Sequence, residues 1–441
     1  MSHTSSGREK SEVKGTAIDV QGIRADFPIL QRKIGDKPLI YFDNAATTQK
    51  PQQVLRTIQE FYCTYNANIH RSPHVLGQEA TELYEQAHKN VARFIGADDG
   101  REIIFVRNST EGINLVAYSL LFSESERLRL HRGDEVVLTV MEHHSNLVPW
   151  QMMRERAGAT LKIVGIHDDG TLDLEQLREA ITERTRLVCC AHVSNVLGTI
   201  NPVREIGRLA HQAGALFLVD GAQSVPHMPV NVKEIGCDFL AFSGHKMLAP
   251  MGIGVLYGKR ELLEEMTPFL YGGGMIADVS LERATWNKLP WKFEAGTPNV
   301  CGGIALGGAT DLRTGQHLEG AIDYLERIGM AQVQAHERTL TAYALEGLRA
   351  IERIRVYGPL DLEKRGGTIT FNVAGSDAHL VAQLLNDEGI AVRSGGHCAY
   401  PLAGRLNVES TVRASFYIYN TRDEVNRFLG ALEDIVRHKL L

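Results

Sequence analysis

Two short apolar runs near the middle of the chain each lead into a residue that could do chemistry. Leu216–Val219 is followed by Asp220, and Phe239–Phe242 is followed by the sequence SGHK, which ends at Lys246. Such runs predict buried strands, and open α/β sheets bind ligands at the carboxyl ends of their strands. A lysine and an acid at one such edge suit pyridoxal phosphate, because the lysine can form a Schiff base and the acid can pair with the pyridinium nitrogen. A plain turn residue is the alternative interpretation of Asp220.

A cofactor of this kind also needs hydrogen-bond donors around its phosphate. The sequence NSTE at 108–111 follows a predicted strand at 103–106, and its first and last residues are spaced as a capping box for a helix at 112–121. Hydroxyl groups at a helix N-terminus favour phosphate binding, although a plain helix cap would have the same sequence. The candidate phosphate ligands are Ser109, Thr110, Ser243 and His245.

Two adjacent histidines, His143 and His144, follow a predicted strand at 135–140. The first could stack on a flat cofactor ring, and the second is interpreted as structural. Together they could instead bind metal in a zinc hydrolase, although such a site needs a carboxylate or thiol partner that the sequence does not identify. Gln223, three residues after Asp220, is near enough in the sequence to reach a ring hydroxyl.

The C-terminal part of the chain carries a cation and a thiol. Arg413 lies in a predicted apolar strand at 412–419, where it must find an anion. A substrate carboxylate and a structural acidic side chain are both candidates. Cys398 lies on a glycine-rich loop beside His397 and near Arg393, and positive neighbours favour the nucleophilic thiolate. Cys189 and Cys190 lie in a predicted strand and are interpreted as packing residues.

Composition excludes several classes of protein. The 441 residues are 44% hydrophobic and 23% charged, which suits two or three globular domains. A net charge of −6 argues against nucleic-acid binding, and no apolar run approaches the ~18 residues of a membrane span. Residues 1–20 are polar and predict a disordered tail rather than a secretory signal. Six cysteines without CxxC spacing indicate free thiols and a reducing compartment.

Strands and helices alternate up to about residue 257, which predicts a mainly parallel sheet covered on both faces. The other segments of this part are strands at 161–164, 187–193 and 252–257 and helices at 51–65, 77–94, 147–156, 174–181 and 203–212. Residues 270–308 are rich in Gly, Pro and Trp and are interpreted as a crossing between domains. The remainder predicts an α+β region, with helices at 331–348, 379–388 and 423–438 and strands near 354–357, 368–373, 390–392 and 412–419.

These segments contain a series of motifs, in the order YFDNAATTQKP, NANIHR, TEGINLVA, EHHSNLVPW, NVLGT, VDGAQS, FSGHK, FEAGTPN, HCA and VRAS. From about Val20 to its C-terminus, the chain resembles the SUF-type cysteine desulfurases of the class V aminotransferase family, which are fold-type I pyridoxal phosphate enzymes. The resemblance implies an α/β fold with a large cofactor-binding domain, residues 45–305, whose mainly parallel sheet is of the seven-stranded type. A smaller α+β domain, residues 21–44 and 306–441, would carry the catalytic cysteine loop.

The resemblance also implies a role for each residue toward the cofactor, pyridoxal 5'-phosphate. Lys246 resembles the Schiff-base lysine that also moves protons, Asp220 the acid at the pyridinium nitrogen, and Gln223 the partner of the ring hydroxyl. His143 resembles the ring-stacking catalytic histidine. The residues that match the phosphate cup are Ser109, Thr110, Ser243 and His245, together with Thr297, which the family takes from the partner subunit of a homodimer.

Further matches concern the substrate. Asn195, Arg393 and Arg413 resemble the substrate contacts, with Arg413 gripping the carboxylate, and Cys398 resembles the nucleophile. The implied reaction converts L-cysteine to L-alanine and leaves a persulfide on Cys398. An acceptor protein of the SUF system would then take the sulfur for iron–sulfur cluster assembly in the cytoplasm.

The cysteine loop is short, since Cys398 and Arg413 are 15 positions apart. This spacing resembles the branch whose loop cannot carry the persulfide far, so the acceptor thiol must approach it. Gly396 stands where this branch usually has histidine, which bears on the acceptor and on the thiol pKa. Selenocysteine lyase and cysteine sulfinate desulfinase use much the same residues and are the enzymatic alternatives, and a non-catalytic scaffold is the alternative from another class.

Overall fold

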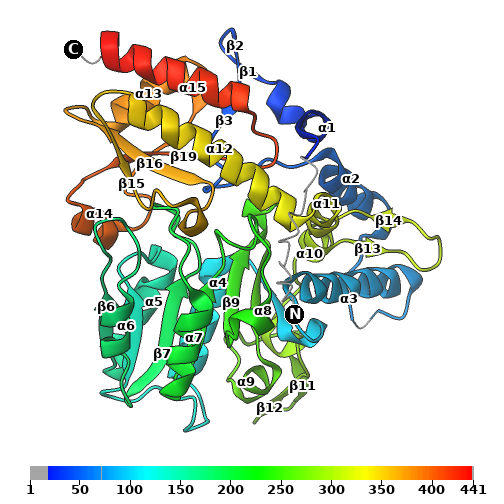
Figure 1. The fold of residues 1–441 in the computed structure, drawn as a ribbon. Helices are drawn as coiled ribbons and strands as arrows, with labels where there is room; N and C mark the ends of the chain where they lie inside the picture. The colour runs from blue at the N-terminus through cyan, green and yellow to red at the C-terminus, as the bar shows by residue number, and fades with distance from the viewer. Residues whose placement is uncertain (1–17, 71, 440–441) are drawn as a thin grey trace, which may run out of the picture.

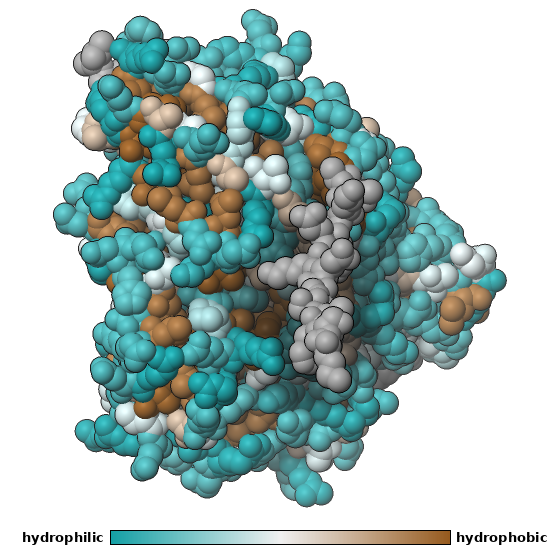
Figure 2. All heavy atoms as spheres, viewed as in Figure 1, coloured by the Kyte–Doolittle hydropathy of each residue, from teal (hydrophilic) through white to brown (hydrophobic). Residues whose placement is uncertain are grey.

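The computed structural model describes residues 18–70 and 72–439, arranged as two main sheets with helices packed around each (Figure 1). The predicted tail, residues 1–20, lies outside the described residues except for its last three positions. Figure 2 shows hydrophilic residues over much of one face, with apolar residues in small separate groups. Among the described residues, no helix combines the length and the apolar character that crossing a bilayer requires.

The larger sheet has seven strands in the order β4-β10-β9-β8-β7-β5-β6. They are β4 (Ile103–Val106), β5 (Glu135–Thr139), β6 (Thr160–Val164), β7 (Thr185–Ala191), β8 (Leu216–Asp220), β9 (Phe239–Ser243) and β10 (Gly254–Gly258). Only β10 runs antiparallel to its neighbours, so the prediction of a mainly parallel sheet is confirmed. Parallel neighbours present their carboxyl ends at one edge, which is where ligands bind in such sheets.

Both faces of this sheet are covered, because its strands are apolar on both sides. In β7, Val188 and Cys190 pack into one core cluster, whereas Leu187 and Cys189 pack into another. The helices of this part are α3 (Val75–Ile95), α4 (Ser109–Leu121), α5 (Val148–Ala157), α6 (Leu174–Ala180), α7 (Val203–Gln212), α8 (Val232–Ile235) and α9 (Arg260–Glu265). The interpretation of the two cysteines as packing residues is confirmed by their complete burial.

The second sheet is antiparallel and has four strands in the order β15-β16-β19-β18. They are β15 (Ile354–Tyr357), β16 (Thr368–Val373), β18 (Arg393–Gly395) and β19 (Thr411–Ser415), and the helices packed on them are α12 (Met330–Ala350), α13 (Ala378–Asp387) and α15 (Arg422–Asp434). In Figure 1 these elements lie together above the larger sheet. The short strand β3 (Ile40–Tyr41) pairs with β17 (Ile390–Ala391) and so joins this group. The domain boundaries remain predictions.

The remaining elements are short or peripheral. The helices are α1 (Val20–Ala25), α2 (Gln52–Glu60), α11 (Ala321–Ile328) and α14 (Tyr400–Leu406), and the strands are β1 (Lys33–Ile34), β2 (Lys37–Pro38), β13 (Ala309–Thr310) and β14 (His317–Leu318). Single helical turns are η1 (Pro28–Gln31), η2 (Phe61–Tyr65), η3 (Gly100–Glu102), η4 (His144–Asn146), η5 (Gly244–Lys246), η6 (Trp291–Phe293), η7 (Leu362–Lys364) and η8 (Ile435–Lys439).

Residues 270–308, interpreted as a crossing between domains, include regular elements that the sequence did not predict. The stretch contains a hairpin, β11 (Ile276–Val279) and β12 (Ala284–Trp286), and a fully buried helix, α10 (Val300–Gly307). The α10 sequence is rich in glycine and therefore disfavours a helix by propensity alone. Glycine is needed because a Cβ at Gly303 would lie 2.7 Å from the Tyr84 ring, and one at Gly307 would lie 2.6 Å from the Ala87 carbonyl oxygen. Close packing on α3 thus overrides propensity.

A buried carboxylate ties this stretch to the larger sheet. Glu294 accepts hydrogen bonds from the Phe105 backbone N–H at 2.8 Å and from the Tyr84 hydroxyl at 3.0 Å. His88 Nε2 lies 2.9 Å from Glu294 Oε1, and both side chains are almost fully buried. One side chain therefore satisfies buried polar groups of α3 and β4.

Replacing Glu294 with alanine is expected to lower the free energy of unfolding by about 3–5 kcal/mol, because breaking a buried pair leaves its partners unsatisfied. Equilibrium urea denaturation measures the change. The control is Glu282→Ala, which removes an exposed carboxylate from the β11–β12 hairpin and is expected to cost less than ~0.5 kcal/mol. Equal stability of the two variants would contradict this account.

Candidate active site

A cavity of about 360 Å³ lies at the carboxyl edge of the larger sheet, beside the N-terminus of α4 and below the second sheet. Twelve of the thirteen predicted site residues line it, namely Ser109, Thr110, His143, Asn195, Asp220, Gln223, Ser243, His245, Lys246, Arg393, Cys398 and Arg413. They come from segments as far apart as Ser109 and Arg413, which are 304 positions apart, so the fold brings them together. The exception is Thr297.

Asp220 and Lys246 share the cavity because they follow neighbouring parallel strands. Asp220 ends β8 and lies in register with Ala241 of β9, and Lys246 follows β9 after a single helical turn. Burial raises the pKa of the Asp220 carboxyl, which accepts a hydrogen bond from the Ala222 backbone N–H at 2.9 Å. Burial lowers the pKa of the Lys246 ammonium to about 8, although the nearby Asp220 opposes this change. The amine can therefore gain or lose a proton near neutral pH.

Hydroxyl groups gather at the N-terminus of α4. The Ser243 hydroxyl accepts a hydrogen bond from the Ser109 backbone N–H at 2.9 Å and lies 2.9 Å from the Ser109 hydroxyl. Asn108 caps the helix, since its side chain accepts from the Glu111 N–H at 3.0 Å. The second half of the predicted capping box is wrong, because the Glu111 carboxylate accepts instead from the Arg107 N–H and side chain. The hydroxyl groups and the positive end of the helix dipole make this end of α4 a suitable anion site.

His143 is held as a neutral ring. Its Nδ1 accepts a hydrogen bond from the Ser145 backbone N–H at 3.1 Å, so the ring proton lies on Nε2. Burial, with a smaller contribution from Lys246, lowers the pKa of His143 to about 4. The Ser145 hydroxyl, 2.6 Å from that of Thr110, joins the histidine to the α4 terminus.

The adjacent Glu142 was missed by the sequence reasoning. Its buried carboxylate accepts from the Thr139 hydroxyl and the Asn146 amide at 2.6 Å each, and from the Ala191 backbone N–H at 3.1 Å. These bonds join the turn that carries His143 to the end of β7. Burial raises the pKa of Glu142 to about 7.

Arg413 is buried and pairs with an acidic side chain, as one of its two interpretations predicts, and its binding of a substrate carboxylate remains a prediction. Its Nη1 donates to the Asn195 backbone carbonyl at 3.0 Å, and its Nη2 lies 3.3 Å from Asp43 Oδ1. Its Nε has no hydrogen-bond partner among the described residues. Arg393 also binds Asp43, with contacts of 2.8 to 3.1 Å. Asp43 was missed, although an acid just after the strand at 40–41 is the signal that identified Asp220.

The Cys398 loop is fixed through its backbone. His397 and Cys398 both have left-handed φ angles, 49° and 55°. The Cys398 carbonyl accepts from the His144 N–H at 2.7 Å, and the His397 carbonyl accepts from the Asn195 side chain at 2.8 Å. The Cys398 side chain remains exposed.

His397 is not a positive neighbour of Cys398, which corrects the prediction. Its buried Nε2 lies 2.9 Å from the Thr411 hydroxyl. Burial and the positive Arg413 lower the pKa of the imidazole to about 3. The ring is therefore neutral, because the cost of desolvating its charged form exceeds any gain.

The two predicted histidines do not form a metal site. Nδ1 of His143 and Nε2 of His144 both accept backbone N–H groups, those of Ser145 and Tyr400 respectively. Among the described residues, no group of three side chains is placed to hold a metal ion. His144 instead positions the cysteine loop, in agreement with its structural interpretation.

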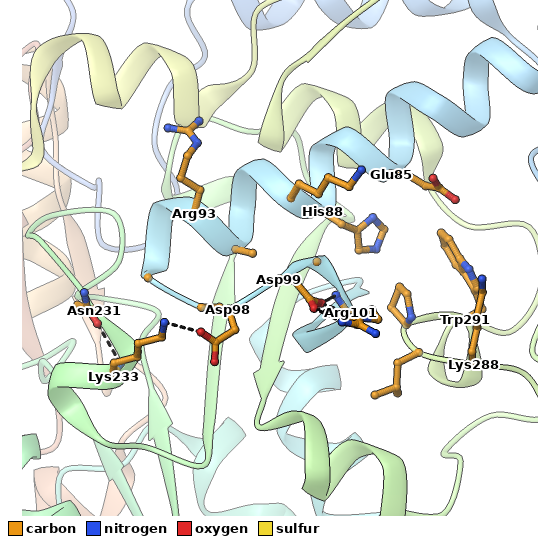
Figure 3. Close-up of a pocket in the computed structure, with 17 residues that line it drawn as sticks. Glu85, His88, Arg93, Asp98, Asp99, Arg101, Asn231, Lys233, Lys288 and Trp291 are labelled. Atoms are coloured by element: carbon orange, nitrogen blue, oxygen red, sulfur yellow. Dashed lines mark hydrogen bonds and ion pairs between the residues drawn. The ribbon is translucent and has the colours of Figure 1, made fainter.

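A larger cavity, of about 880 Å³, lacks such a set of side chains (Figure 3). Four of the charged groups along it form two ion pairs, since Lys233 binds Asp98 and Arg101 binds Asp99. Volume alone therefore does not identify the reactive site. Thr297 is exposed and lines a third hollow, with Glu111 and Asn299.

The smaller cavity fits pyridoxal phosphate in the type and placement of its polar groups. The buried acid and the amine with lowered pKa lie on adjacent strands, and the hydroxyl groups lie at a helix N-terminus. Three buried donor or acceptor atoms of residues along its wall, His245 Nδ1, His397 Nδ1 and Arg413 Nε, have no partner among the described residues. Such atoms favour a polar ligand, because leaving them unpaired is costly.

Comparisons with known proteins agree with this geometry. The family described as Aminotransferase class-V matches residues 40–428. A cysteine desulfurase of Haloferax volcanii is 48% identical over 429 residues, which covers 94% of this chain and 96% of the relative. A probable cysteine desulfurase of Halobacterium salinarum is 50% identical over 418 residues, with 95% and 96% covered.

Solved structures give the same result. The apo structure of a cysteine desulfurase from Thermococcus onnurineus NA1 has a TM-score of 0.87 and 43% identity, and the match covers 95% of this chain and 98% of that one. A cysteine desulfurase from Escherichia coli has a TM-score of 0.85 and 37% identity, with 97% and 100% covered. The fold is therefore that of the fold-type I pyridoxal phosphate enzymes.

The lowered pKa of Lys246 predicts a pH-dependent stability of the cofactor-free protein. The unfolded chain binds more protons than the folded chain between about pH 8 and 10.5, so stability rises across this window. Lys246→Met is therefore expected to be more stable than the parent below pH 8, by at most about 3 kcal/mol, and to lose this advantage by pH 10.5. Urea denaturation at pH 7, 9 and 10.5 tests this, with Lys288→Met at an exposed position as the control. A constant difference between variant and parent would show that burial does not affect this amine.

Proposed function

The chain belongs to the class V aminotransferase family and is a pyridoxal 5'-phosphate enzyme of the cysteine desulfurase group, and we propose that it converts L-cysteine to L-alanine with a persulfide on Cys398. The observation that carries this proposal is the meeting of Lys246, Asp220, Arg413 and Cys398 in one cavity. An amine, an acid, a carboxylate-binding cation and an exposed thiol are the groups that this reaction needs.

The residues that would hold the cofactor follow from their chemistry. Asp220 would face the protonated ring nitrogen and Lys246 the aldehyde, with Gln223 at the ring hydroxyl and the neutral His143 against the ring. The groups proposed for the phosphate are Ser109, Thr110, Ser243 and His245. When bound, the cofactor withdraws electrons from Cα of the amino acid substrate.

Two of the chain's own groups would act on the substrate. Arg413 would bind the substrate carboxylate, while Asn195 and Asp43 fix the orientation of its guanidinium. The Lys246 amine would take the proton from Cα, since its pKa of about 8 leaves part of it neutral at physiological pH. Fixing both groups before the substrate arrives removes the entropic cost of bringing them together.

The Cys398 thiolate would then attack the substrate sulfur. The bond from Cβ to sulfur breaks, a bond between the two sulfurs forms, and Cβ keeps the electron pair and takes a proton, while the proton that Lys246 took from Cα returns to Cα. The products are L-alanine and a persulfide on Cys398, and no oxidant or reductant is needed. The backbone contacts of the loop to His144 and Asn195 keep the sulfur in place.

Because the Cys398 sulfur is exposed and its loop is held by backbone contacts, a sulfur acceptor must approach it from outside. We infer that a sulfur-acceptor protein of the SUF type presents its own thiol to Cys398, and that the sulfur supplies iron–sulfur cluster assembly in the cytoplasm. Gly396 leaves room for the ring of Tyr400, since a Cβ there would lie 2.5 Å from it. The approach to the thiol therefore lies beside an exposed tyrosine.

Replacing Cys398 with alanine is expected to lower alanine formation from L-cysteine at least about 100-fold, because the sulfur acceptor is removed while cofactor binding is kept. Alanine is measured with purified holoenzyme, and the visible absorbance of the cofactor reports its binding. Cys63→Ala, at the other exposed thiol, is the control and is expected to keep full activity. Full activity of Cys398→Ala would disprove the persulfide route, whereas retained turnover of selenocysteine alone would not.

The proposed homodimer places Thr297 at the phosphate of the partner subunit. Its exposure on the chain's own surface and its distance from the chain's own cavity support this. Thr297→Ala and Lys246→Ala are each expected to be inactive or impaired alone. When the two variants are mixed as hetero-oligomers, up to about a quarter of the parent activity is expected to return, because one of the two sites in each mixed dimer regains all its residues. Alanine formation after mixing and refolding measures this, and the absence of recovery would place Thr297 outside the partner's site.

A further inference from the structure

Two arginines stand directly opposite each other in the second sheet. Arg393 of β18 and Arg413 of β19 are register partners in an antiparallel pair. Like charges in such positions are destabilising, and Arg413 is almost fully buried. A nearby anion is therefore required for the sheet to hold both guanidinium groups at the cavity wall.

Asp43 supplies that anion. Its carboxylate makes three contacts of 2.8 to 3.1 Å with Arg393 and one of 3.3 Å with Arg413. Among the described residues, no other carboxylate forms an ion pair with either arginine. Asp43 itself does not line the cavity, so it acts from behind the two cations.

The three side chains together carry one net positive charge. Arg413 keeps a buried, unpartnered Nε, whereas Asp43 already occupies the guanidinium fork of Arg393. The other two charged groups along the wall, Lys246 and Asp220, have opposite signs. The cluster therefore matches a ligand with one carboxylate and offers little to a second anionic group.

We propose that Asp43 is a specificity-determining residue, which sets the charge of the substrate pocket for a monoanionic amino acid and disfavours one with an anionic side chain. This inference rests on the proposed function. The relevant competitor of L-cysteine is L-cysteine sulfinate, whose side chain carries a second negative charge. With Asp43 in place, that sulfinate meets an arginine whose charge is already paired and whose Nε and Nη2 already donate to a carboxylate.

The reaction of the competitor balances without the thiol. The bond from Cβ to sulfur breaks, sulfur leaves as sulfur dioxide, and Cβ keeps the electron pair and takes a proton to give L-alanine. Alanine formation therefore measures the turnover of both substrates, and the sulfinate reaction does not require Cys398.

The test compares kcat/KM for L-cysteine sulfinate and L-cysteine in the parent holoenzyme and in Asp43→Asn. The ratio of sulfinate to cysteine is expected to rise about tenfold in the variant, because one negative charge a few ångströms from the second anionic group is removed. The change is expected mainly in KM. If Asp43 only supported the sheet, its replacement would lower kcat/KM for both substrates alike. An unchanged or lower ratio of sulfinate to cysteine would therefore overturn the proposal.

A charge-restoring pair separates electrostatics from structure. Asp43→Asn combined with Arg393→Gln returns the cluster to one net positive charge, and the ratio is expected to return toward that of the parent. Arg393→Gln alone makes the cluster neutral and is expected to lower the ratio below the parent's. This second variant keeps the proposal testable if Asp43→Asn fails to fold, and a raised ratio in it would contradict the proposal.

Binding without turnover distinguishes the inference from the proposed function. Calorimetric affinities of the holoenzyme for L-alanine and L-aspartate compare a monoanionic carboxylate ligand with a dianionic one. Asp43→Asn is expected to shift this preference toward L-aspartate by a similar factor. A shift without any cysteine turnover would retain the inference and reject the desulfurase proposal, whereas turnover without a shift would do the reverse.

Discussion

The full or partial burial of most of the ionisable side chains around the cavity is the constraint on which the rest of the site depends. Burial makes an isolated charge costly, so each ionisable group is either neutral or compensated. His143 and His397 are neutral, with pKa values of about 4 and 3. The charges of Lys246 and Arg413 are compensated, because Lys246 lies near Asp220 and Arg413 lies near Asp43. The same burial that destabilises these charges keeps Lys246 close to its point of titration.

Several of the predicted features could be read from the chain because they are local. Asp220 and Lys246 each end an apolar run, and the parallel order of β8 and β9 makes them neighbours. The mainly parallel sheet and the burial of Cys189 and Cys190 follow from the same signal. The series of motifs identified the remaining candidate residues, so these positions could be predicted from the sequence without the fold.

Other features depend on contacts between distant segments and left little local signal. Asp43 matters only because two arginines about 350 and 370 positions away converge on it. Glu142 and His144 act through backbone groups of β7 and of the cysteine loop, which no pattern in their own segment reveals. The helix α10 contradicts its own glycine content because α3 packs closely against it. His397 resembled a positive neighbour of the thiol until its burial was known.

The cavity is shared between the two main sheets, so the seam that joins them sets its geometry. Residues 194–200 form this seam, where Gly198 accepts from the Gly366 N–H at 2.9 Å and Val196 accepts from the Thr370 hydroxyl. Asn195, in the middle, binds Arg413 through its carbonyl and His397 through its side chain. Lys246 belongs to one side of this seam, whereas Arg413 and Cys398 belong to the other. A substrate held by Arg413 therefore keeps a constant distance to the amine only while these backbone bonds persist. Because these bonds are largely buried and none is an exposed ion pair, salt screens them little, and the geometry is insensitive to ionic strength.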